Sequence, residues 1–503
     1  MYTMEKYFWW NEKQKKLADA AAEFSDSVIA PRIKEIERTK KFPWEFMAEI
    51  GRRGWFGILI PEEYGGMGKD YGTTGMCIVL EEIARGAAVA VDFYETTIYG
   101  YSPIVRFGTK EQKKRYLPGL ATGERFCCIA ITEPFCGSDA AAVQTTAVPA
   151  GDEYVINGRK RFITVGGVGN LYCVYCKTSD DPKDRAQHRH MSAFLVEKGT
   201  PGFSVEAIHD VMGRFGSRHA ALRFRDVRVP KENRILDEGD GWKVMADALN
   251  IERLGVAAGA IGVARSSLNE TLNYTHRRVQ FGKTLSEIPA IQFMGSDMIT
   301  SILLGHMLTY YTARMLDSGA DVPLGASVAK LFTTDSLMKT TLDAVQCHGG
   351  DGYTTQYPVE RHMRDSKLIQ IGAGSNEILR TLVWKQWEKE ALAHEQTTRA
   401  PLQERRITGE DAKRAVMEAL AEDYKRHPGL YMRREDLQEK LGLGEEALDQ
   451  LLQVLEKEEL VALHRIRKRI ALAKATYEGL DRTKPKEYYL SIPDFVDRNK
   501  ELF

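Results

Sequence analysis

The order of local patterns along the chain constrains the fold more than any other feature. Apolar residues at helical spacing dominate residues 1–125, short β-branched and aromatic runs separated by turns occupy residues 126–238, and long helical patterns return over residues 239–392. Few architectures place a small β-domain between two helical domains. We therefore expect a mainly α protein with a helical N-terminal domain, a central barrel or sandwich, and a C-terminal helical bundle.

Proline and glycine signals give finer expectations inside these domains. Pro103 falls within the apolar helical stretch Ala87–Phe107, so we expect that helix to bend or break there. Lys110–Tyr116 predicts a short basic helix that leads to Pro118. Asn157-Gly158 is typical of a tight turn between two strands and predicts a hairpin.

The last hundred or so residues form a region with a different pattern. Residues 393–406 are polar and charged and predict a linker to a separate unit over residues 407–503. Helix–turn–helix spacing around Gly442-Leu443-Gly444, followed by a short hairpin pattern, resembles a winged-helix module. A basic group could contact phosphate, and it comprises Arg465, Arg467, Lys468 and Arg469. Acidic residues are interleaved throughout, so we favour a packing or partner-docking module over a nucleic-acid-binding one.

Composition limits the partners and the compartment. Lys plus Arg and Asp plus Glu both number 70, so net charge gives no support for a nucleic-acid or membrane partner. We find no secretory signal, and no run of about 18 uncharged apolar residues predicts a membrane span. The seven cysteines are scattered and typical of reduced thiols. Cys173 and Cys176 lie in a β-type run that directs them to opposite faces. We expect a cytoplasmic protein without a metal site.

The stretch Thr132–Asp139, Thr-Glu-Pro-Phe-Cys-Gly-Ser-Asp, carries the first chemical signal. It follows an apolar run, Phe126–Ile131, that predicts a buried strand. Hydroxyl groups and exposed backbone N–H groups at such a turn can hold a polar ring edge or a phosphate. An ordinary strand followed by a turn explains these eight residues equally well, so the octapeptide alone decides nothing.

An ordered set of motifs resembles the acyl-CoA dehydrogenase family over residues 5–392. The motifs are Pro61–Gly66, Thr132–Asp139, Asn157-Gly158, Phe162–Thr164, Asp226–Pro230, Arg278–Gly282, Gln346–Tyr353 and Gly372–Glu377. Such a set is far more specific than one Gly-rich turn. The resemblance implies a helical N-terminal domain, a β-barrel middle domain and a C-terminal four-helix bundle. It also implies FAD as cofactor, a homotetramer built from dimers, and an electron-transferring flavoprotein as electron acceptor.

The resemblance also implies which residues hold FAD. They are Ile129, Ile131, Thr132, Ser138, Phe162, Thr164, Arg278, Phe281, Gln346, Gly349, Gly350, Ser375 and Glu377. The isoalloxazine ring would lie between the Ile129–Ser138 stretch and the Phe162–Thr164 stretch. Arg278 and the Gln346–Gly350 turn would hold the pyrophosphate across a subunit boundary, a task that suits the fixed fork of guanidinium donors.

The implied reaction is α,β-dehydrogenation of an acyl-CoA thioester to the trans-2-enoyl-CoA. A carboxylate removes the α-proton while the β-hydride passes to flavin N5. Many members carry this carboxylate directly before the Gly of the late Gly-rich turn, where this chain has Ala373. Isovaleryl-CoA and long-chain members carry it on a helix of the C-terminal domain, and Glu252 falls on that position. We therefore predict that Glu252 is the catalytic base.

Substrate specificity is only partly indicated. The resemblance implies substrate contacts from Ser138, Asn250, Arg253, Ala373 and Gly374. Glu95 and Tyr99 either lie near the floor of the acyl pocket and limit chain length, or are ordinary packing residues. The pairing of Ala373 with Glu252 favours a branched or otherwise substituted short chain, or a long chain. An acyl-CoA oxidase or a flavin monooxygenase on the same fold stays open as an alternative.

Overall fold

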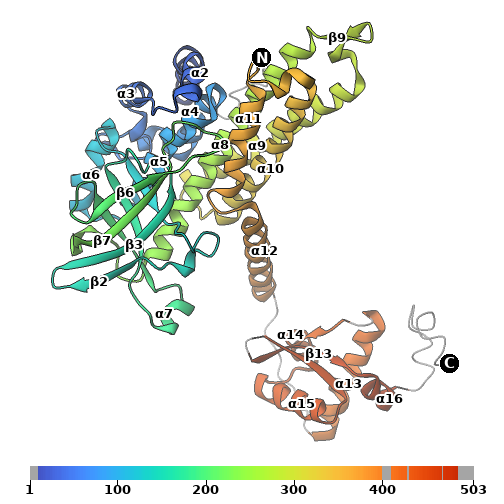
Figure 1. Cartoon of the computed structure of the whole chain (residues 1–503). Coiled ribbons are helices and arrows are strands. Elements are labelled where there is room, and N and C mark those ends of the chain that lie inside the picture. The colour runs from blue at the N-terminus through green and yellow to red at the C-terminus, as the bar shows by residue number, and fades with distance from the viewer. Residues whose placement is uncertain (1–9, 399–408, 428–429, 467, 485–503) are drawn as a thin grey trace. The chain divides into compact units, whose positions relative to one another are not determined.

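The computed structural model describes residues 10–398, 409–427, 430–466 and 468–484. The chain divides into two compact units, residues 1–390 and 391–503. Each unit has its own cluster of buried apolar side chains. Within the first unit the described elements run from helices through a sheet to helices again, as Figure 1 shows by colour. The prediction of a mainly α protein with a central β-domain is confirmed.

The N-terminal part is helical. It comprises α1 (Glu12–Phe24), α2 (Ala30–Thr39), α3 (Trp44–Arg52), α4 (Gly68–Gly86), α5 (Ala88–Phe107) and α6 (Lys110–Thr122), with a π-helical turn at Ser25–Ile29. We expected a bend or a break at Pro103, and the break is wrong, because α5 continues through this residue. Pro103 cannot donate to the carbonyl of Tyr99, and the Ser102 hydroxyl donates to that carbonyl instead, at 2.9 Å. The helix predicted to end at Tyr116 likewise continues through Pro118 to Thr122.

The central sheet has the strand order β6-β7-β3-β2-β4-β5-β8, with β1 paired in parallel to β4. The strands are β1 (Cys127–Ala130), β2 (Thr146–Ala150), β3 (Glu153–Ile163), β4 (Leu171–Lys177), β5 (Met191–Glu197), β6 (Phe203–Ile208), β7 (Ala220–Pro230) and β8 (Arg234–Ile235). A short helix, α7 (Pro182–Ala186), lies between β4 and β5. The parallel β1–β4 pair anchors β1, so the turn after Ala130 begins from a fixed strand end.

The hairpin predicted at Asn157-Gly158 is wrong. These residues lie inside β3, and the turn between β2 and β3 is at residues 151–152. Gly158 has a φ of 153°, and the pairing of β3 with β7 shifts register beside it. A Cβ atom at Gly158 would lie 2.4 Å from the Thr145 hydroxyl oxygen. The glycine therefore permits an irregular strand to pass close to its neighbour rather than forming a turn.

The C-terminal helices of this unit pack around α8. They are α8 (Gly241–Thr275), α9 (Pro289–Asp317), α10 (Pro323–His348), α11 (Val359–Ile371) and α12 (Asn376–Thr398), with a small hairpin of β9 (Val279–Gln280) and β10 (Lys283–Thr284). The linker predicted from residue 393 is wrong for its first residues, because α12 runs to Thr398. Among the described residues, none of the helices combines the length and apolar character that a membrane span requires.

Three glycines of α8 allow two N-terminal helices to approach it closely. A Cβ atom at Gly255 would lie 2.1 Å from a carboxylate oxygen of Glu95 on α5, and one at Gly262 would lie 2.0 Å from the carbonyl oxygen of Glu81 on α4. Gly259 faces Val91 of α5 in the same way. These contacts bring α5 against the part of α8 that follows Glu252.

The second unit contains α13 (Gly409–Arg426), α14 (Arg434–Leu441), α15 (Glu445–Lys457) and α16 (Tyr477–Thr483). Its sheet has the order β11-β13-β12, formed by β11 (Met432–Arg433), β12 (Val461–Ile466) and β13 (Arg469–Ala475). The buried leucines of α14 and α15 pack with those of α13 and the sheet. Helices followed by an antiparallel hairpin agree with the winged-helix-like order that the sequence predicts.

Candidate active site

Glu252 lies on α8 and interacts with side chains of two other helices, Tyr99 of α5 and Lys330 of α10. Burial raises the pKa of its carboxyl from the ordinary value to about 7, while hydrogen bonding with Tyr99 and the positive charges of Arg253 and Lys330 oppose that rise. The pKa of a general base is best placed near the working pH. The surroundings of Glu252 therefore suit a group that takes up a proton at neutral pH.

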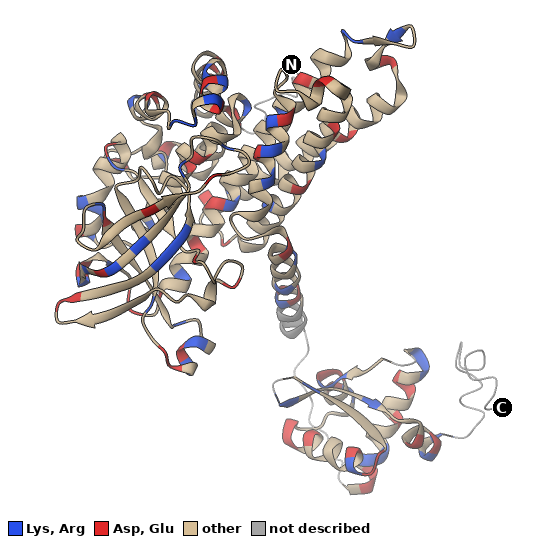
Figure 2. Cartoon of the chain, in the orientation of Figure 1, with Lys and Arg blue, Asp and Glu red and all other residues tan. Residues whose placement is uncertain are grey.

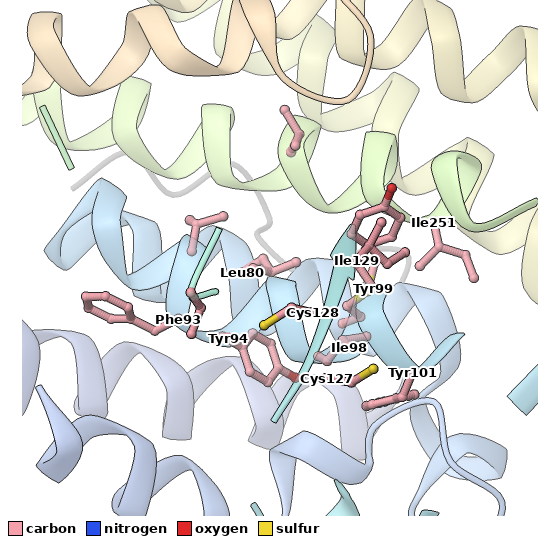
Figure 3. Packing of buried hydrophobic residues seen from close by; sticks show 14 of the residues in the cluster. Leu80, Phe93, Tyr94, Ile98, Tyr99, Tyr101, Cys127, Cys128, Ile129 and Ile251 are labelled. Carbon is pink, nitrogen blue, oxygen red and sulfur yellow. The ribbon is translucent and has the colours of Figure 1, made fainter. Parts of the chain in front are cut away.

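Tyr99 belongs to the apolar cluster beside this carboxylate. Figure 3 shows the cluster, in which Tyr99 of α5, Ile129 of β1 and Ile251 of α8 are labelled. The pKa of Tyr99 is raised well above its usual range, first by burial and then by the charge of Glu252. The phenol therefore keeps its proton and can donate it in a hydrogen bond to the carboxylate.

Lys330 on α10 was not anticipated from the sequence. Its side chain is fully buried, and its ammonium donates to the carbonyl oxygen of Gly374 at 2.9 Å and to the side-chain oxygen of Asn376 at 2.8 Å. Burial lowers the pKa of Lys330 to about 7. The available signal was a lone lysine within a helical run of small and apolar residues, where a charged side chain needs a partner.

The turn before α12 is tied to α8 beside the base. Ala373 and Gly374 have φ values of 55° and 85°, a conformation that a non-glycine residue rarely adopts. The Arg253 guanidinium donates to the carbonyl oxygen of Ala373 at 3.4 Å and to the Ser327 hydroxyl at 3.3 Å. It also donates to the side-chain oxygen of Asn250 at 3.4 Å. The structure thus joins Arg253 to Asn250 and to the Ala373–Gly374 turn, directly beside Glu252 in the sequence. Their role as one substrate site stays a prediction.

A first group of predicted cofactor residues lies at the sheet. Ile129 and Ile131 share one face of the chain leaving β1, and the carbonyl oxygen of Thr132 accepts from the backbone N–H of Arg161 at 2.7 Å. This bond places the turn after β1 next to the end of β3. Phe162 follows with a φ of 58° and a side chain that is 51% exposed. Thr164 is half-buried and Ser138 is exposed, so both hydroxyl groups are accessible to a ligand.

A buried ion pair that sequence reasoning missed supports this turn. The Lys160 ammonium lies 2.8 Å from the Glu133 carboxylate and also donates to the carbonyl oxygens of Ile131 and Tyr175. Glu133 accepts from the backbone N–H groups of Gln144 and Thr145. The charge of Lys160 holds the pKa of Glu133 below its ordinary value in spite of burial. Both charges are therefore paired, and they fix the backbone on either side of Thr132.

A second group of predicted cofactor residues lies at the end of the helical bundle. Arg278, Phe281, Gln346, Gly349 and Gly350 are all exposed, and Phe281 is 92% exposed. Figure 1 shows the β9 hairpin at the end of the bundle away from the sheet. The two groups of predicted cofactor residues therefore do not meet within one copy of the chain.

The members of this second group are nevertheless held next to one another. The Tyr274 hydroxyl donates to the carboxylate of Asp351 at 2.7 Å, and its ring stacks on His348 at 4.4 Å between centroids. Tyr274 lies in the last turn of α8, shortly before Arg278, whereas Asp351 follows Gly349-Gly350. Ser375 and Glu377 lie elsewhere, at the start of α12, where Ser375 is half-buried and Glu377 is exposed.

A cleft of about 530 Å³ opens beside Asn250. It is lined by residues of α5 and of the first turns of α8, and by the connection between α9 and α10. Arg106 and Lys243 stand at its walls, with Arg106 paired to Asp247 at 2.9 Å. Asp247, Asp317 and Asp321 line it as well, so the cleft offers charged groups of both signs at the side of the site that carries Asn250.

The basic group of the C-terminal unit has acidic neighbours. Arg465 pairs with Glu456 of α15, and Lys468 and Arg469 stand at the β12–β13 turn. Arg467 lies outside the described residues. The α15 helix, in the position that a recognition helix would take, carries Glu445, Glu446, Asp449 and Glu456. Figure 2 shows Lys and Arg interspersed with Asp and Glu over this unit.

Comparison with known proteins identifies the family. The chain matches the acyl-CoA dehydrogenase N-terminal domain over residues 11–124, the middle domain over 128–227 and the C-terminal domain over 239–387. It is 39% identical over 376 residues to an acyl-CoA dehydrogenase of Bacillus subtilis (strain 168), which covers 74% of this chain and 97% of the relative. The chain belongs to the acyl-CoA dehydrogenase family. The resemblance predicted from the motifs is confirmed, and the chain is an enzyme of this family.

Solved structures agree with this assignment. Butyryl-CoA dehydrogenase of Megasphaera elsdenii is 35% identical and superposes with a TM-score of 0.73, covering 76% of this chain and 99% of that one. A structure described as the electron transferring flavoprotein of Acidaminococcus fermentans is 38% identical, with a TM-score of 0.72 and the same coverage. The FAD complex of PigA is 25% identical with a TM-score of 0.71, covering 76% of this chain and all of that one. The matched domains end at residue 387, before the second unit.

Proposed function

We propose that this enzyme converts an acyl-CoA thioester to the trans-2-enoyl-CoA, with Glu252 removing the α-proton. The observation that carries the proposal is the half-buried Glu252 side chain, whose carboxyl has a pKa of about 7, beside a turn whose residue 373 is alanine. An α C–H group is weakly acidic, so its removal needs a desolvated base and fixed donors for the charge that develops on the thioester oxygen. The backbone N–H of the Ala373–Gly374 turn is the donor that we assign to this oxygen.

FAD is the cofactor that the residues of the sheet fit. Phe162 offers an exposed ring face for stacking, Thr132, Ser138 and Thr164 offer hydroxyl groups, and a Cβ atom at Gly137 would meet nothing within 4 Å. When bound, FAD would accept the β-hydride at N5. The role of Phe162 and Thr164 is then to hold the ring so that a substrate α-carbon can face Glu252.

We infer that the complete cofactor site needs a second copy of the chain. The sheet residues would hold the ring of FAD, and the exposed Arg278, Phe281 and Gln346–Gly350 turn of the other copy would hold its pyrophosphate. A Cβ atom at Gly349 or Gly350 would have no neighbour within 4 Å. The backbone of this turn is therefore open to a phosphate. A homotetramer built from such dimers is the assembly that we propose.

An electron-transferring flavoprotein is the acceptor that we propose, because a chain in the structure described as that of Acidaminococcus fermentans is among the similar proteins. An oxidase or a flavin monooxygenase on the same fold is the alternative function. A monooxygenase would not need a carboxylate at position 252. Oxygen consumption measured against dye reduction, with the same acyl-CoA, separates the dehydrogenase from both alternatives.

The deciding experiment is a screen of acyl-CoA thioesters for loss of the oxidised flavin absorbance. Butyryl-, isovaleryl- and palmitoyl-CoA cover the short, branched and long chains that the pairing of Glu252 with Ala373 leaves open. Glu252→Gln should retain FAD and lose flavin reduction with every active thioester. Glu270→Gln, about five turns further along α8, is the matched control and should behave like the wild type. Flavin reduction at near wild-type rate in Glu252→Gln would refute the base assignment.

The C-terminal unit is proposed to dock a protein partner rather than nucleic acid. The acidic residues of α15 would repel phosphates from the helix that a winged-helix protein normally inserts into DNA. The full-length enzyme should therefore show no salt-dependent shift of duplex DNA in a gel. A shift that weakens as salt increases would instead support a nucleic-acid-binding function.

A further inference from the structure

Helix α5 carries a row of titratable side chains, and the proposed reaction gives no role to two of them, Asp92 and Glu95. Asp92, Glu95 and Tyr99 are spaced by three and four residues and so lie along one helix face. All three are buried, with exposed fractions of 6%, 8% and 8%. Acidic side chains are seldom buried unless they are paired or have a chemical role. The row therefore needs an explanation beyond packing.

The first end of the row meets α8 at the catalytic base. Tyr99 interacts with Glu252, as described above. A carboxylate oxygen of Glu95, Oε1, lies against Gly255, one helical turn beyond Glu252, where a Cβ atom would be only 2.1 Å away. This Oε1 atom is buried and has no hydrogen-bond partner within the described residues. Glu95 is thus next to the base and has an oxygen available for one more hydrogen bond.

The other end of the row meets the loop before β7. Asp92 forms an ion pair with Arg214, and its Oδ2 atom lies 3.7 Å from the Nε2 atom of His219. Oδ2 also has no hydrogen-bond partner within the described residues. His219 is buried, and its backbone carbonyl accepts from the backbone N–H of His209 at 2.9 Å.

His209 brings the line of groups to the accessible side of the molecule. Its ring lies 4.7 Å from that of Phe162, which is half-exposed, and its Nε2 atom is buried without a partner in the described part of the chain. Three buried atoms thus have no partner within the described residues: Oε1 of Glu95, Oδ2 of Asp92 and Nε2 of His209. Their residues are linked in turn by one face of α5, by the 3.7 Å between Asp92 and His219, and by the backbone bond between His219 and His209. A polar site of this kind is where proteins hold bridging water.

We propose that Glu95, His219 and His209, with bridging water, carry the substrate α-proton from Glu252 to solvent, and that Asp92 stabilises the charge on His219. This inference rests on the proposed function of Glu252. In the first step the protonated Glu252 gives its proton to one oxygen of Glu95 as Glu95 releases its own from the other oxygen. That proton reaches His219, whose imidazolium is stabilised by Asp92, and passes to His209 and then to water. Each transfer breaks one O–H or N–H bond at the donor and forms one O–H or N–H bond at the acceptor, and no electrons are exchanged with a cofactor.

The charged groups around these side chains favour transfer of the proton from Glu252 towards His219. Burial, together with the charges of Glu252 and Asp92, raises the pKa of Glu95 well above its usual range, which favours the protonated form of its carboxyl. Burial lowers the pKa of His219, so its ring is neutral and able to accept one. Arg214 is fixed by Asp92 and by Asp365 of α11, while the charges of Arg253 and Lys330 lower the pKa of Glu252. These cations therefore favour release of the proton from Glu252.

The test separates proton exit from proton abstraction. The FAD-loaded enzyme, in excess, is given an acyl-CoA with sulfur at the β position, which can lose an α-proton but cannot donate a β-hydride. Exchange of the α-hydrogen with D2O is followed by mass spectrometry, and flavin reduction by an oxidisable acyl-CoA is measured separately. In Glu95→Gln the ratio of the exchange rate to the flavin-reduction rate should fall about tenfold or more, because an amide cannot relay a proton.

Two further variants complete the design. His219→Gln should lower the same ratio, and it serves if Glu95→Gln does not bind FAD. Thr97→Val is the matched control, because Thr97 also has a buried, unpartnered hydroxyl group but lies on the opposite face of α5. An unchanged ratio in both Glu95→Gln and His219→Gln would overturn the relay. Flavin reduction retained in Glu252→Gln would instead overturn the base assignment, so the two failures are distinguishable.

Discussion

Tyr99 of α5 and Glu252 of α8 form a hydrogen-bonding pair between two domains of the catalytic unit. The phenol donates to the ionised carboxylate, and so it lowers a pKa that burial raises. Burial on one side, and this hydrogen bond with the charges of Arg253 and Lys330 on the other, place the Glu252 pKa at about 7. A residue of the N-terminal domain thus tunes the proposed base on the C-terminal bundle.

At low substrate concentration, the rate of flavin reduction should rise with pH through about 7, which is the pKa of Glu252 in the ligand-free enzyme. Only the carboxylate can accept the α-proton, so the rate is low where Glu252 is protonated and reaches a plateau above its pKa. Stopped-flow measurement of flavin absorbance across the neutral range checks this. A rate independent of pH over that range would contradict the assigned pKa.

Tyr99→Phe should move the midpoint of that pH profile upward. Loss of a hydrogen bond worth about 0.5–1.5 kcal/mol corresponds to a shift of about 0.4–1.1 pH units. Tyr101→Phe is the control on the same helix, because its buried hydroxyl donates to the Phe56 carbonyl oxygen and not to Glu252. That control should lose stability without moving the midpoint, and equal shifts in both variants would argue against a specific Tyr99–Glu252 interaction.

Glu133→Gln should destabilise the catalytic unit strongly. The substitution leaves the Lys160 ammonium buried without its carboxylate, at an expected cost of about 3–5 kcal/mol in the free energy of unfolding. Glu153→Gln breaks the exposed pair with Arg228 and should cost less than about 1 kcal/mol. Urea unfolding of both variants provides the comparison. Similar stabilities would mean that the Glu133–Lys160 pair does not hold the turn before Ser138.

Mixing two inactive variants should restore activity if FAD bridges two copies of the chain. Arg278→Gln should lose FAD and Glu252→Gln should lose proton abstraction. After the subunits are exchanged, a mixed dimer has one site with an intact Glu252 and an intact Arg278 from the other chain. Random pairing then gives about one quarter of the sites as active. Activity no greater than the sum of the two separate variants would show that both residues act within one chain.

Much of the fold could be predicted because the relevant signals are local. Helical spacing, β-branched runs and their order along the chain all survive in the structure. The errors occurred where a neighbour overrode a local signal. Pro103 stays within α5 because Ser102 satisfies the freed carbonyl oxygen, and Gly158 lies within a strand because Thr145 passes close to it.

In the candidate site, too, residues with a local sequence signal could be predicted, and residues whose role depends on a distant neighbour could not. Glu252 could be proposed from its position in a family motif together with the missing carboxylate at Ala373. Lys330 could not, since its role depends on the carbonyl oxygen of Gly374, which the fold brings to it from a distant part of the sequence. The Glu133–Lys160 pair was missed for the same reason, because β3 carries Lys160 to the turn after β1.

The two units of the chain have separate apolar cores, with no described residue belonging to both. Selection can therefore act on the stability of one unit without changing the packing of the other. A single recombination event near the boundary at residue 390 could add, exchange or remove the C-terminal unit while the surroundings of Glu252 stay as they are. The chain can thus acquire a new localisation or a new mode of regulation without any change to its active site.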